Sequence, residues 1–212
     1  MSKLLQRLGT AALALGLSQA AMAITIYDNG APNLVYGTAM AEFKVSENFT
    51  LGTAYDLTNL RFWSIQDAAA SYTGSVFWEV STPSGAQPGA VVATGLAAVA
   101  ATPTGGSTGF GYGVYAFDIP VAFSLSAGNY WLTLHNGPMS NITPSEMLWA
   151  TTAVQVGSFG LYNDGTWINS GNEHAFAIDG NVAVIPEPAT AGLMLAGLAG
   201  ALSLARRRRA AA

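Results

Sequence analysis

The sequence contains no cysteine, and Asp, Glu, Lys and Arg together make up only 9% of its 212 residues. An ordinary globular domain is roughly one quarter charged. Without a thiol, the chain can form no disulfide bond, no thiolate metal site and no cysteine nucleophile. It has two histidines, His135 and His174, and no ligand-pair spacing that predicts a zinc site. We therefore predict no catalytic residues and no metal held by thiolates or histidines.

Basic residues are almost absent from the middle of the chain. Between residues 24 and 185, only Lys44 and Arg61 stand against eleven acidic residues, and all other basic residues lie near the two ends. Binding to phosphate backbones needs clustered Lys and Arg. The composition therefore excludes nucleic acid as a partner.

The first 23 residues have the pattern of a secretory signal peptide. Lys3 and Arg7 precede an apolar stretch, and the small residues Ala21 and Ala23 form a cleavage site before Ile24. The alternative is a short membrane anchor, but the apolar stretch is too short to span ~30 Å of hydrocarbon. We predict a signal helix over residues 1–23, and hence export.

The C-terminal end has three parts in a fixed order. A Pro-Glu-Pro tripeptide, in which proline disfavours helix, precedes the uncharged segment 189–205, and four arginines follow. As a helix, the uncharged segment would be about 25 Å long, close to the core of a thin bilayer, and arginines hold the end of a chain on the cytoplasmic side. The tripeptide residues are Pro186, Glu187 and Pro188, and the stop residues are Arg206, Arg207, Arg208 and Arg209.

This C-terminal arrangement resembles the sorting signal of the bacterial PEP-CTERM proteins. The tripeptide 186–188, the predicted transmembrane helix 189–205 and the basic tail 206–209 match that signal in order, and the chain departs from it only by residues 210–212. The resemblance implies recognition of the tripeptide by exosortase, a membrane-embedded processing enzyme, in a Gram-negative host that makes exopolysaccharide. The alternative is an ordinary membrane tail anchor. The resemblance covers residues 186–212 and concerns sorting, so it implies nothing about the activity of the middle.

Residues 24–185 are long enough for one domain with its own core. Short runs rich in Val, Phe, Tyr, Trp, Ile and Thr alternate with Gly- and Pro-rich turns, a pattern typical of all-β domains. We predict a single jelly-roll-like β-sandwich ectodomain, with an immunoglobulin-type sandwich as the alternative. The expected strands cover residues 40–45, 57–65, 76–81, 90–99, 115–120, 128–136, 146–151 and 175–184, a hairpin turns at Asp164-Gly165, and residues 103–109 form a flexible loop.

The strand 128–136 shows a two-residue period. Tyr130, Leu132 and Leu134 share the face that we assign to the core, whereas Trp131 and His135 share a half-exposed face. His174 follows in a loop.

Two kinds of ligand are compatible with this composition. Flat rings beside polar side chains can bind a pyranose, and Trp131 and Trp167 are the candidates for a glycan site. Calcium is the candidate ion, because oxygen ligands are frequent at 163–164, 172–173 and 179–181, although Asn, Asp and Gly are also ordinary turn residues. We predict no other cofactor.

These observations together predict an exported, non-enzymatic protein of the cell surface or extracellular matrix. Its precursor would be held transiently in the inner membrane, processed by exosortase, and then placed in an exopolysaccharide layer. One alternative is a carbohydrate-binding, lectin-like module. An exported hydrolase is a further alternative, although the sequence has no Gly-x-Ser-x-Gly motif and no spacing that selects a carboxylate pair.

Overall fold

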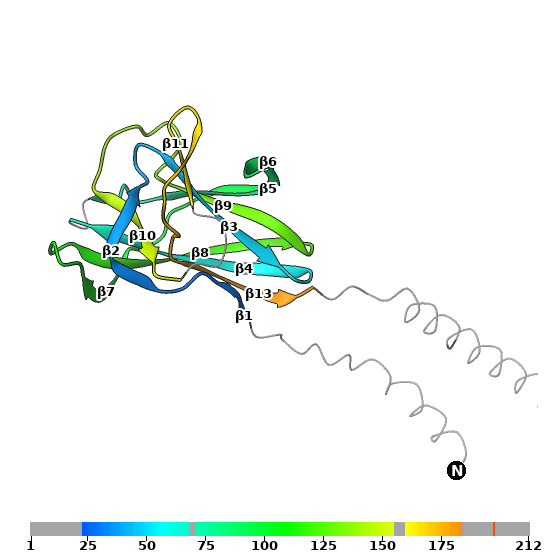
Figure 1. Cartoon of the computed structure of the whole chain (residues 1–212). Helices are drawn as coiled ribbons and strands as arrows, with labels where there is room; N and C mark the ends of the chain where they lie inside the picture. The colour runs from blue at the N-terminus through cyan, green and yellow to red at the C-terminus, as the bar shows by residue number, and fades with distance from the viewer. Residues whose placement is uncertain (1–22, 68–70, 155–159, 184–196, 198–212) are drawn as a thin grey trace, which may run out of the picture.

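The chain folds into a two-layer β-sandwich. The computed structural model describes residues 23–67, 71–154, 160–183 and 197. Thirteen strands form two sheets, and within the described residues up to 183 there is no α-helix (Figure 1). Nor does any helix of the described residues have the length and apolar character to cross a membrane. The predicted all-β sandwich is confirmed, and the predicted signal helix and C-terminal helix lie outside the described residues, apart from Ala23 and Gly197.

The first sheet, sheet A, is built around one long strand, β4. One side of β4 pairs with β8, and β7 follows at the edge, whereas the other side pairs first with β13 and then with β10. β1 pairs with the outer edge of β13, and β2 pairs with the outer edge of β10. The β13–β1 pair and the β10–β2 pair therefore follow one another along the same side of β4. The strands of sheet A are β1 (Ile24–Asp28), β2 (Pro32–Ala39), β4 (Tyr55–Gln66), β7 (Thr102–Ser107), β8 (Gly113–Leu125), β10 (Met147–Thr152) and β13 (Phe176–Val182).

The second sheet, sheet B, has six strands in one antiparallel row. Its order is β12-β11-β3-β9-β5-β6, with β9 near the centre and β6 at an edge. The bounds are β3 (Lys44–Leu51), β5 (Val76–Ser84), β6 (Gln87–Ala97), β9 (Gly128–Asn136), β11 (Leu161–Asn163) and β12 (Trp167–Asn169). The Asp164-Gly165 hairpin joins β11 to β12, as predicted, and Gly165 has a φ of 77° that favours glycine.

The core lies between the two sheets. Tyr130, Leu132 and Leu134 contribute to it from β9, as predicted, and Phe62 of β4 stacks on Phe117 of β8. The other face of β9 is buried too, and His135 is only 2% exposed. The expectation of a half-exposed His135 is therefore wrong, because its face of β9 is covered along its length: Trp131 and Thr133 on the same face are 4% and 0% exposed.

Four strands, β1, β2, β3 and β7, were missed or displaced in the expected order. The predicted strand 40–45 is displaced, since β3 begins only at Lys44, and β1 and β2 were not anticipated. The expected flexible loop at 103–109 contains most of β7, a Thr- and Gly-rich edge strand that pairs irregularly with β8. Pairing with a stable neighbour therefore overrides the weak strand preference of these residues.

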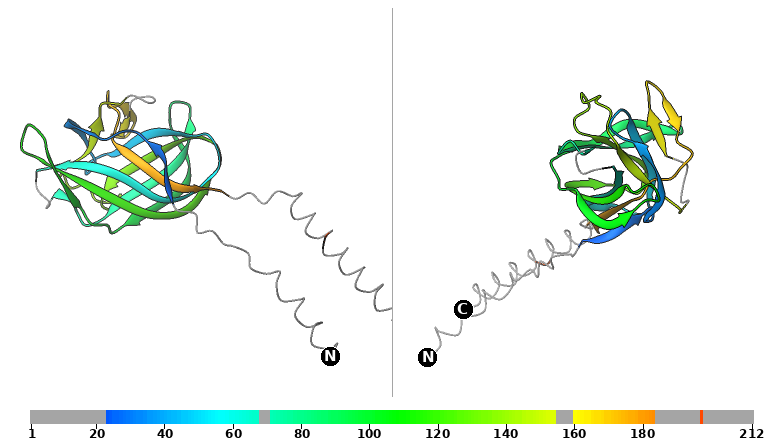
Figure 2. Two further views of the ribbon diagram at one scale, coloured as in Figure 1. Left: turned by 90° about the horizontal axis from the view of Figure 1, so that it is seen from below. Right: turned by 90° about the vertical axis from the view of Figure 1, so that its left-hand side faces the viewer.

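Both ends of the described sandwich lie at the same end of the molecule. Ile24 of β1 pairs with Gly180 of β13, and the Ala183 amide donates to the Ala54 carbonyl over 3.1 Å. We call this end, defined by residues 24, 54 and 183, the terminal pole. The β7–β8 connection lies at the opposite end, the distal pole (Figures 1 and 2).

Candidate functional site

The predicted sorting residues cannot be placed, because they lie outside the described residues. This holds for Ala21 of the signal cleavage site, for the tripeptide Pro186, Glu187 and Pro188, and for the arginines 206–209. Ala23 is described and exposed, immediately before β1.

The two candidate tryptophans lie apart in sheet B. Trp131, on β9, is only 4% exposed, so its ring presents no face to a sugar. Trp167 begins β12 and is half-buried. Because β11 and β3 separate β12 from β9, the two rings do not form a common site, and Trp167 alone stays a glycan candidate.

The three segments with candidate calcium ligands are also separate. Asp164 lies in the exposed β11–β12 turn, Glu173 is buried between the sheets, and Asp179 of β13 accepts hydrogen bonds from Thr25 and Asn59. Among the residues that the structure describes, no group of three or more His, Asp or Glu side chains could hold a metal ion. The residues at these turns therefore do not converge on one ion.

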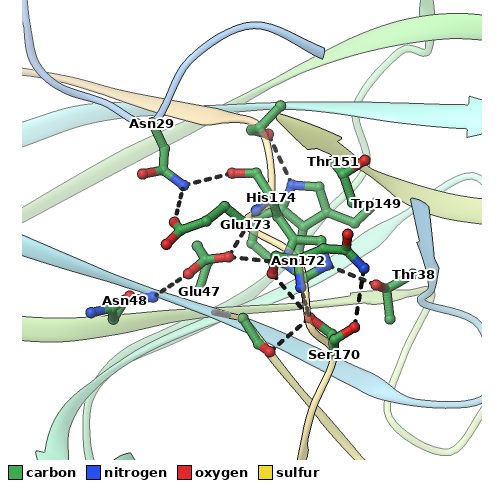
Figure 3. A network of polar contacts seen from close by, with 12 residues as sticks. Asn29, Thr38, Glu47, Asn48, Trp149, Thr151, Ser170, Asn172, Glu173 and His174 are labelled. Carbon is green, nitrogen blue, oxygen red and sulfur yellow. Dashed lines mark hydrogen bonds and ion pairs between the residues drawn. The ribbon is translucent and has the colours of Figure 1, made fainter. Parts of the chain in front are cut away.

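An unexpected polar network lies inside the sandwich (Figure 3). Glu47 is the inward-facing residue between Val45 and Phe49 on β3, and it is 0% exposed. Its Oε2 accepts the backbone N–H of His174 at 2.8 Å and lies 2.9 Å from Nδ1 of the same residue. Nε2 of His174 lies 2.8 Å from Oγ1 of Thr38 on β2.

The loop before β13 brings His174 into the core. Thr151 of β10 forms a β-bridge with His174, the Thr152 amide donates to the Glu173 carbonyl, and the Ala175 amide donates to the Ala150 carbonyl. Earlier in the loop, the Ser170 hydroxyl donates to the carbonyl of Gly160 at 2.7 Å. Residues 173–175 therefore prolong the pairing of sheet A, and the His174 side chain points between the sheets.

Asn29 ties the β1–β2 connection to the same network. Its amide nitrogen donates to the His174 carbonyl at 2.8 Å and to Oε2 of Glu173 at 3.2 Å, and its own oxygen accepts the Tyr27 hydroxyl at 3.0 Å. The ring of Trp149 packs over His174, with 5.0 Å between centroids. The network thus joins β1, β2, β3, β10 and the start of β13.

Burial determines the protonation of this network. Desolvation raises the pKa of the Glu47 carboxyl well above 4.5, with nearby Glu173 as a second cause, and lowers the pKa of His174 to about 3. Both directions favour an uncharged pair, in which Glu47 donates its proton to Nδ1 and Nε2–H donates to Thr38. Desolvation also raises the pKa of the Tyr27 phenol. Because these side chains are buried, the network offers solvent no acid or base.

A separate apolar pocket lies on the outer face of sheet A. Its volume is about 340 Å³, and its exposed wall includes Phe110, which is 82% exposed, and Tyr36, which is 56% exposed. The Tyr112 hydroxyl donates to the Glu146 carboxylate over 3.3 Å, which places an acid close to the pocket. The lining residues are Val35, Tyr36, Gly37, Ile65, Thr108, Phe110, Tyr112 and Leu148. Such a pocket suits a flat, apolar group.

Sequence reasoning missed both places. His174 was expected in an ordinary loop, and Glu47 was not singled out because the strand containing it was placed too early. The inward alternation of Val45, Glu47 and Phe49 is the one sequence signal that would have identified a buried acid. The pocket residues come from four distant segments, and no local pattern connects them.

Comparison with known proteins concerns the C-terminal end. Residues 184–209 match the family model of the PEP-CTERM protein-sorting motif. No curated protein sequence matches the chain. The match covers the tripeptide, the uncharged segment and the arginines, so the recognition made from the sequence is confirmed. The motif implies exosortase-dependent sorting of an exported protein. The chain is therefore a protein with a C-terminal PEP-CTERM sorting motif.

Proposed function

We propose that this protein is a non-enzymatic building block or adhesin of the cell surface or extracellular matrix. Residues 1–23 direct export, the helix 189–205 holds the precursor in the inner membrane, and Arg206–Arg209 keep its end in the cytoplasm. Exosortase then processes the chain at 186–188, and the sandwich enters an exopolysaccharide layer. The observation that carries the proposal is the sorting motif, whose match begins two residues after the end of β13.

The arrangement of the sandwich supports this proposal. With the chain entering and leaving at the terminal pole, a tether at residue 183 directs the distal pole away from the membrane. The connections support a jelly-roll-like variant of the sandwich, because most successive strands lie in opposite sheets. The burial of both histidines supports a role without catalysis, since neither imidazole contacts solvent appreciably.

Intact mass and cell fractionation test the sorting step. In a host with exosortase, we expect a mature chain that begins at Ile24 and ends near residues 186–188, outside the inner membrane. Deleting the processing enzyme should leave the chain in the membrane with Arg206–Arg209 attached. A chain that keeps its arginines in the presence of the enzyme would contradict the proposal and indicate an ordinary tail anchor.

The arginines allow a matched comparison of charge. Replacing Arg206–Arg209 with Gln should remove the charge that holds the C-terminal end in the cytoplasm. Processing by exosortase and the cell fraction that contains the protein should both change. Replacing Lys44 and Arg61 with Gln also removes basic charge, but from the sandwich, and should leave sorting as it is.

A carbohydrate-binding module is a second candidate function. The apolar pocket favours it, because Tyr36, Phe110 and Tyr112 offer aromatic rings near the carboxylate of Glu146. Retention on immobilised exopolysaccharide tests this role: Phe110→Ala should weaken retention if the pocket binds glycan, and Trp167→Ala should do so if β12 does. Equal retention of the native protein and both variants would exclude both places.

A further inference from the structure

A second pocket lies at the side of the sandwich, between β2 of sheet A and the β11–β12 hairpin of sheet B. Its volume of about 270 Å³ is below the roughly 300–1,000 Å³ of pockets for drug-sized ligands, so it suits a small group. Only Tyr36 also borders the apolar pocket on the outer face of sheet A. We call this second pocket the aromatic cage, and its lining residues are Tyr36, Thr38, Ala39, Phe43, Tyr162 and Asp164.

Three aromatic rings from separate segments form the walls of the aromatic cage. Phe43 precedes β3 and Tyr162 lies on β11, and their rings form a corner, with centroids 5.3 Å apart and planes tilted by 55°. Tyr162 pairs with the core residue Val45, so its ring lies on the inner face of sheet B. Tyr36 contributes the third ring from β2 and is 56% exposed. The faces of aromatic rings carry partial negative charge, which attracts a cation.

The polar side-chain atoms of the cage are all oxygens. Asp164 supplies a carboxylate, and among the described residues this carboxylate has no ion pair and no side-chain hydrogen bond. No lining side chain carries an N–H donor or a positive charge. The carboxylate would repel an anion, and a sugar would bring more hydroxyl groups than these few oxygens can satisfy. The lining therefore favours a cation.

The two basic residues of the sandwich do not occupy the cage. Lys44 pairs with Asn163, so its side chain leaves sheet B from the face opposite to Tyr162. Arg61 forms an ion pair with Asp118 on sheet A, with 2.7 Å between Nε and Oδ1. Because eleven acidic residues stand against these two basic ones, the sandwich as a whole attracts cations.

The buried polar network holds one wall of the cage in place. Thr38 is only 9% exposed, and its Oγ1 lies 2.8 Å from Nε2 of His174. The next residue, Ala39, is paired with Leu148 of β10. Groups that are already fixed by other contacts lose little freedom when a ligand binds. The ligand therefore does not have to order this wall.

We propose that the aromatic cage binds the quaternary ammonium group of a small cation. The methyl groups contact the rings of Tyr36, Phe43 and Tyr162, and the carboxylate of Asp164 balances the charge. A primary ammonium group suits the cage less well, because it is compact and strongly hydrated, whereas methyl groups extend over several rings. This site goes beyond the proposed function and does not depend on sorting.

Choline and its neutral analogue, in which carbon replaces the nitrogen, test the role of charge at constant shape. We expect an NMR titration of the full chain, purified in an uncharged detergent, to show saturable binding of choline. The neutral analogue should bind about tenfold more weakly, because it loses the attraction to the rings and to the carboxylate. No binding of choline, or equal binding of the two compounds, would overturn the proposal.

Glycerophosphocholine distinguishes a free cation from a lipid headgroup. It carries a phosphate close to the same ammonium group, and the carboxylate of Asp164 repels that phosphate. We therefore expect it to bind more weakly than choline. Tighter binding of glycerophosphocholine would overturn the assignment to a small free cation.

A change of one charge tests the carboxylate. Asp164→Asn keeps the hairpin turn, because Asn-Gly suits a tight turn as well as Asp-Gly does, and it should weaken choline binding about fivefold. Asp56→Asn is the matched control, since Asp56 pairs with Asn181 near the terminal pole, and it should leave binding unchanged. Equal effects of the two variants would show that only the overall charge acts, which would overturn the site.

Replacing one ring tests the wall. Tyr36→Leu should weaken choline binding about fivefold, whereas Tyr36→Phe keeps the ring and should bind as the native protein does. Phe110→Leu is the matched control, because Phe110 lines only the apolar pocket. Both positions are exposed, and equal unfolding midpoints would show that all three variants are folded. Unchanged binding in Tyr36→Leu, or an equal loss in Phe110→Leu, would contradict the proposal.

Discussion

Glu47 and His174 are ionisable residues that the fold holds uncharged. A charge at either position would cost free energy in the apolar core, and each side chain satisfies its polar atoms within the network instead. The pair is therefore a structural element whose energy depends on pH.

The two pKa shifts predict a stability plateau between about pH 4.5 and 6.5. In this range the folded pair holds one proton on Glu47, and the unfolded chain holds one on its histidine, so pH has no effect through this pair. Below pH 4.5 the unfolded chain binds one proton more, and stability falls as the pH falls towards 3. Above pH 6.5 the unfolded histidine has lost its proton, and stability falls as the pH rises for as long as the buried Glu47 carboxyl keeps its own proton. The slope of each limb is at most about 1.4 kcal/mol per pH unit, the value for a difference of one whole proton.

Denaturant unfolding between pH 3.5 and 8.5 measures both limbs. Glu47→Gln removes the titrating carboxyl, and it should therefore remove the fall above pH 6.5. Because one amide atom cannot both accept the His174 backbone N–H and donate to Nδ1, this variant should be less stable than the native protein at pH 5. Glu79→Gln, on the outward face of β5, should leave that fall in place. An unchanged alkaline limb in Glu47→Gln would mean that Glu47 is ionised in the folded protein.

Gly160 is required by the same network. A Cβ at this position would lie 2.6 Å from Oε2 of Glu47 and closer still to the His174 ring. Gly160→Ala should therefore displace the network and lower the free energy of unfolding by about 2–4 kcal/mol. Gly52→Ala is the control, because a Cβ there would meet no atom within 4 Å. Equal denaturant midpoints for the two variants would refute the explanation.

Sequence reasoning could not find this pair, for a physical reason. Glu47 and His174 are 127 residues apart, and only the packing of β3 against the start of β13 brings them together. A histidine in a polar segment such as 171–174 looks solvent-exposed until its pairing with Thr151 is known.

At the scale of elements, the strands with a clear two-residue period were the predictable ones. β9 agrees with its expected bounds, and β4, β10 and β13 differ from theirs by a few residues at most. β1, β2 and β7 were missed because they lie at or near a sheet edge, where pairing compensates for weak alternation. Leu34 in β2 even adopts a φ of 61°, which no propensity of leucine favours.

The close approach of β2 to β10 depends on Gly37. A Cβ here would lie 2.8 Å from the carbonyl oxygen of Trp149, a backbone atom that cannot move aside cheaply. We expect Gly37→Ala to cost about 1–3 kcal/mol and to push β2 away from β10. Hydrogen exchange should show lost protection within residues 33–39 and retained protection in sheet B. Retained protection in β2 would show that the strand tolerates the methyl group.

At the scale of the whole molecule, the sandwich and the sorting motif are consecutive parts of the chain. The core and the sheets are complete by Val182, and the motif match begins at residue 184. The motif was recognisable from the sequence because its order of parts is local. The pairing of strands distant in the sequence, which builds the sandwich, was not.

Removing residues 186–212 should therefore change the cell fraction that contains the protein but leave the stability of the sandwich unchanged. We expect the truncated chain to leave the membrane fraction and to keep its unfolding free energy within about 0.5 kcal/mol, because no core residue is lost. A chain that ends at Ala175 also loses β13, which pairs with both β1 and β4, and it should not fold. A large loss of stability on removing 186–212 alone would show that the tail supports the sandwich.

The position of β13 also determines how the protein would bear mechanical force. In the proposed precursor, tension between the membrane and the distal pole runs from residue 183 along β13, which lies between β1 and β4. The hydrogen bonds of an antiparallel pair are perpendicular to the strands, so such tension loads them together in shear and does not open them one after another. The strand next to the tether is thus held on both sides by bonds that must fail collectively, which suits a protein anchored in a layer that flows and stretches.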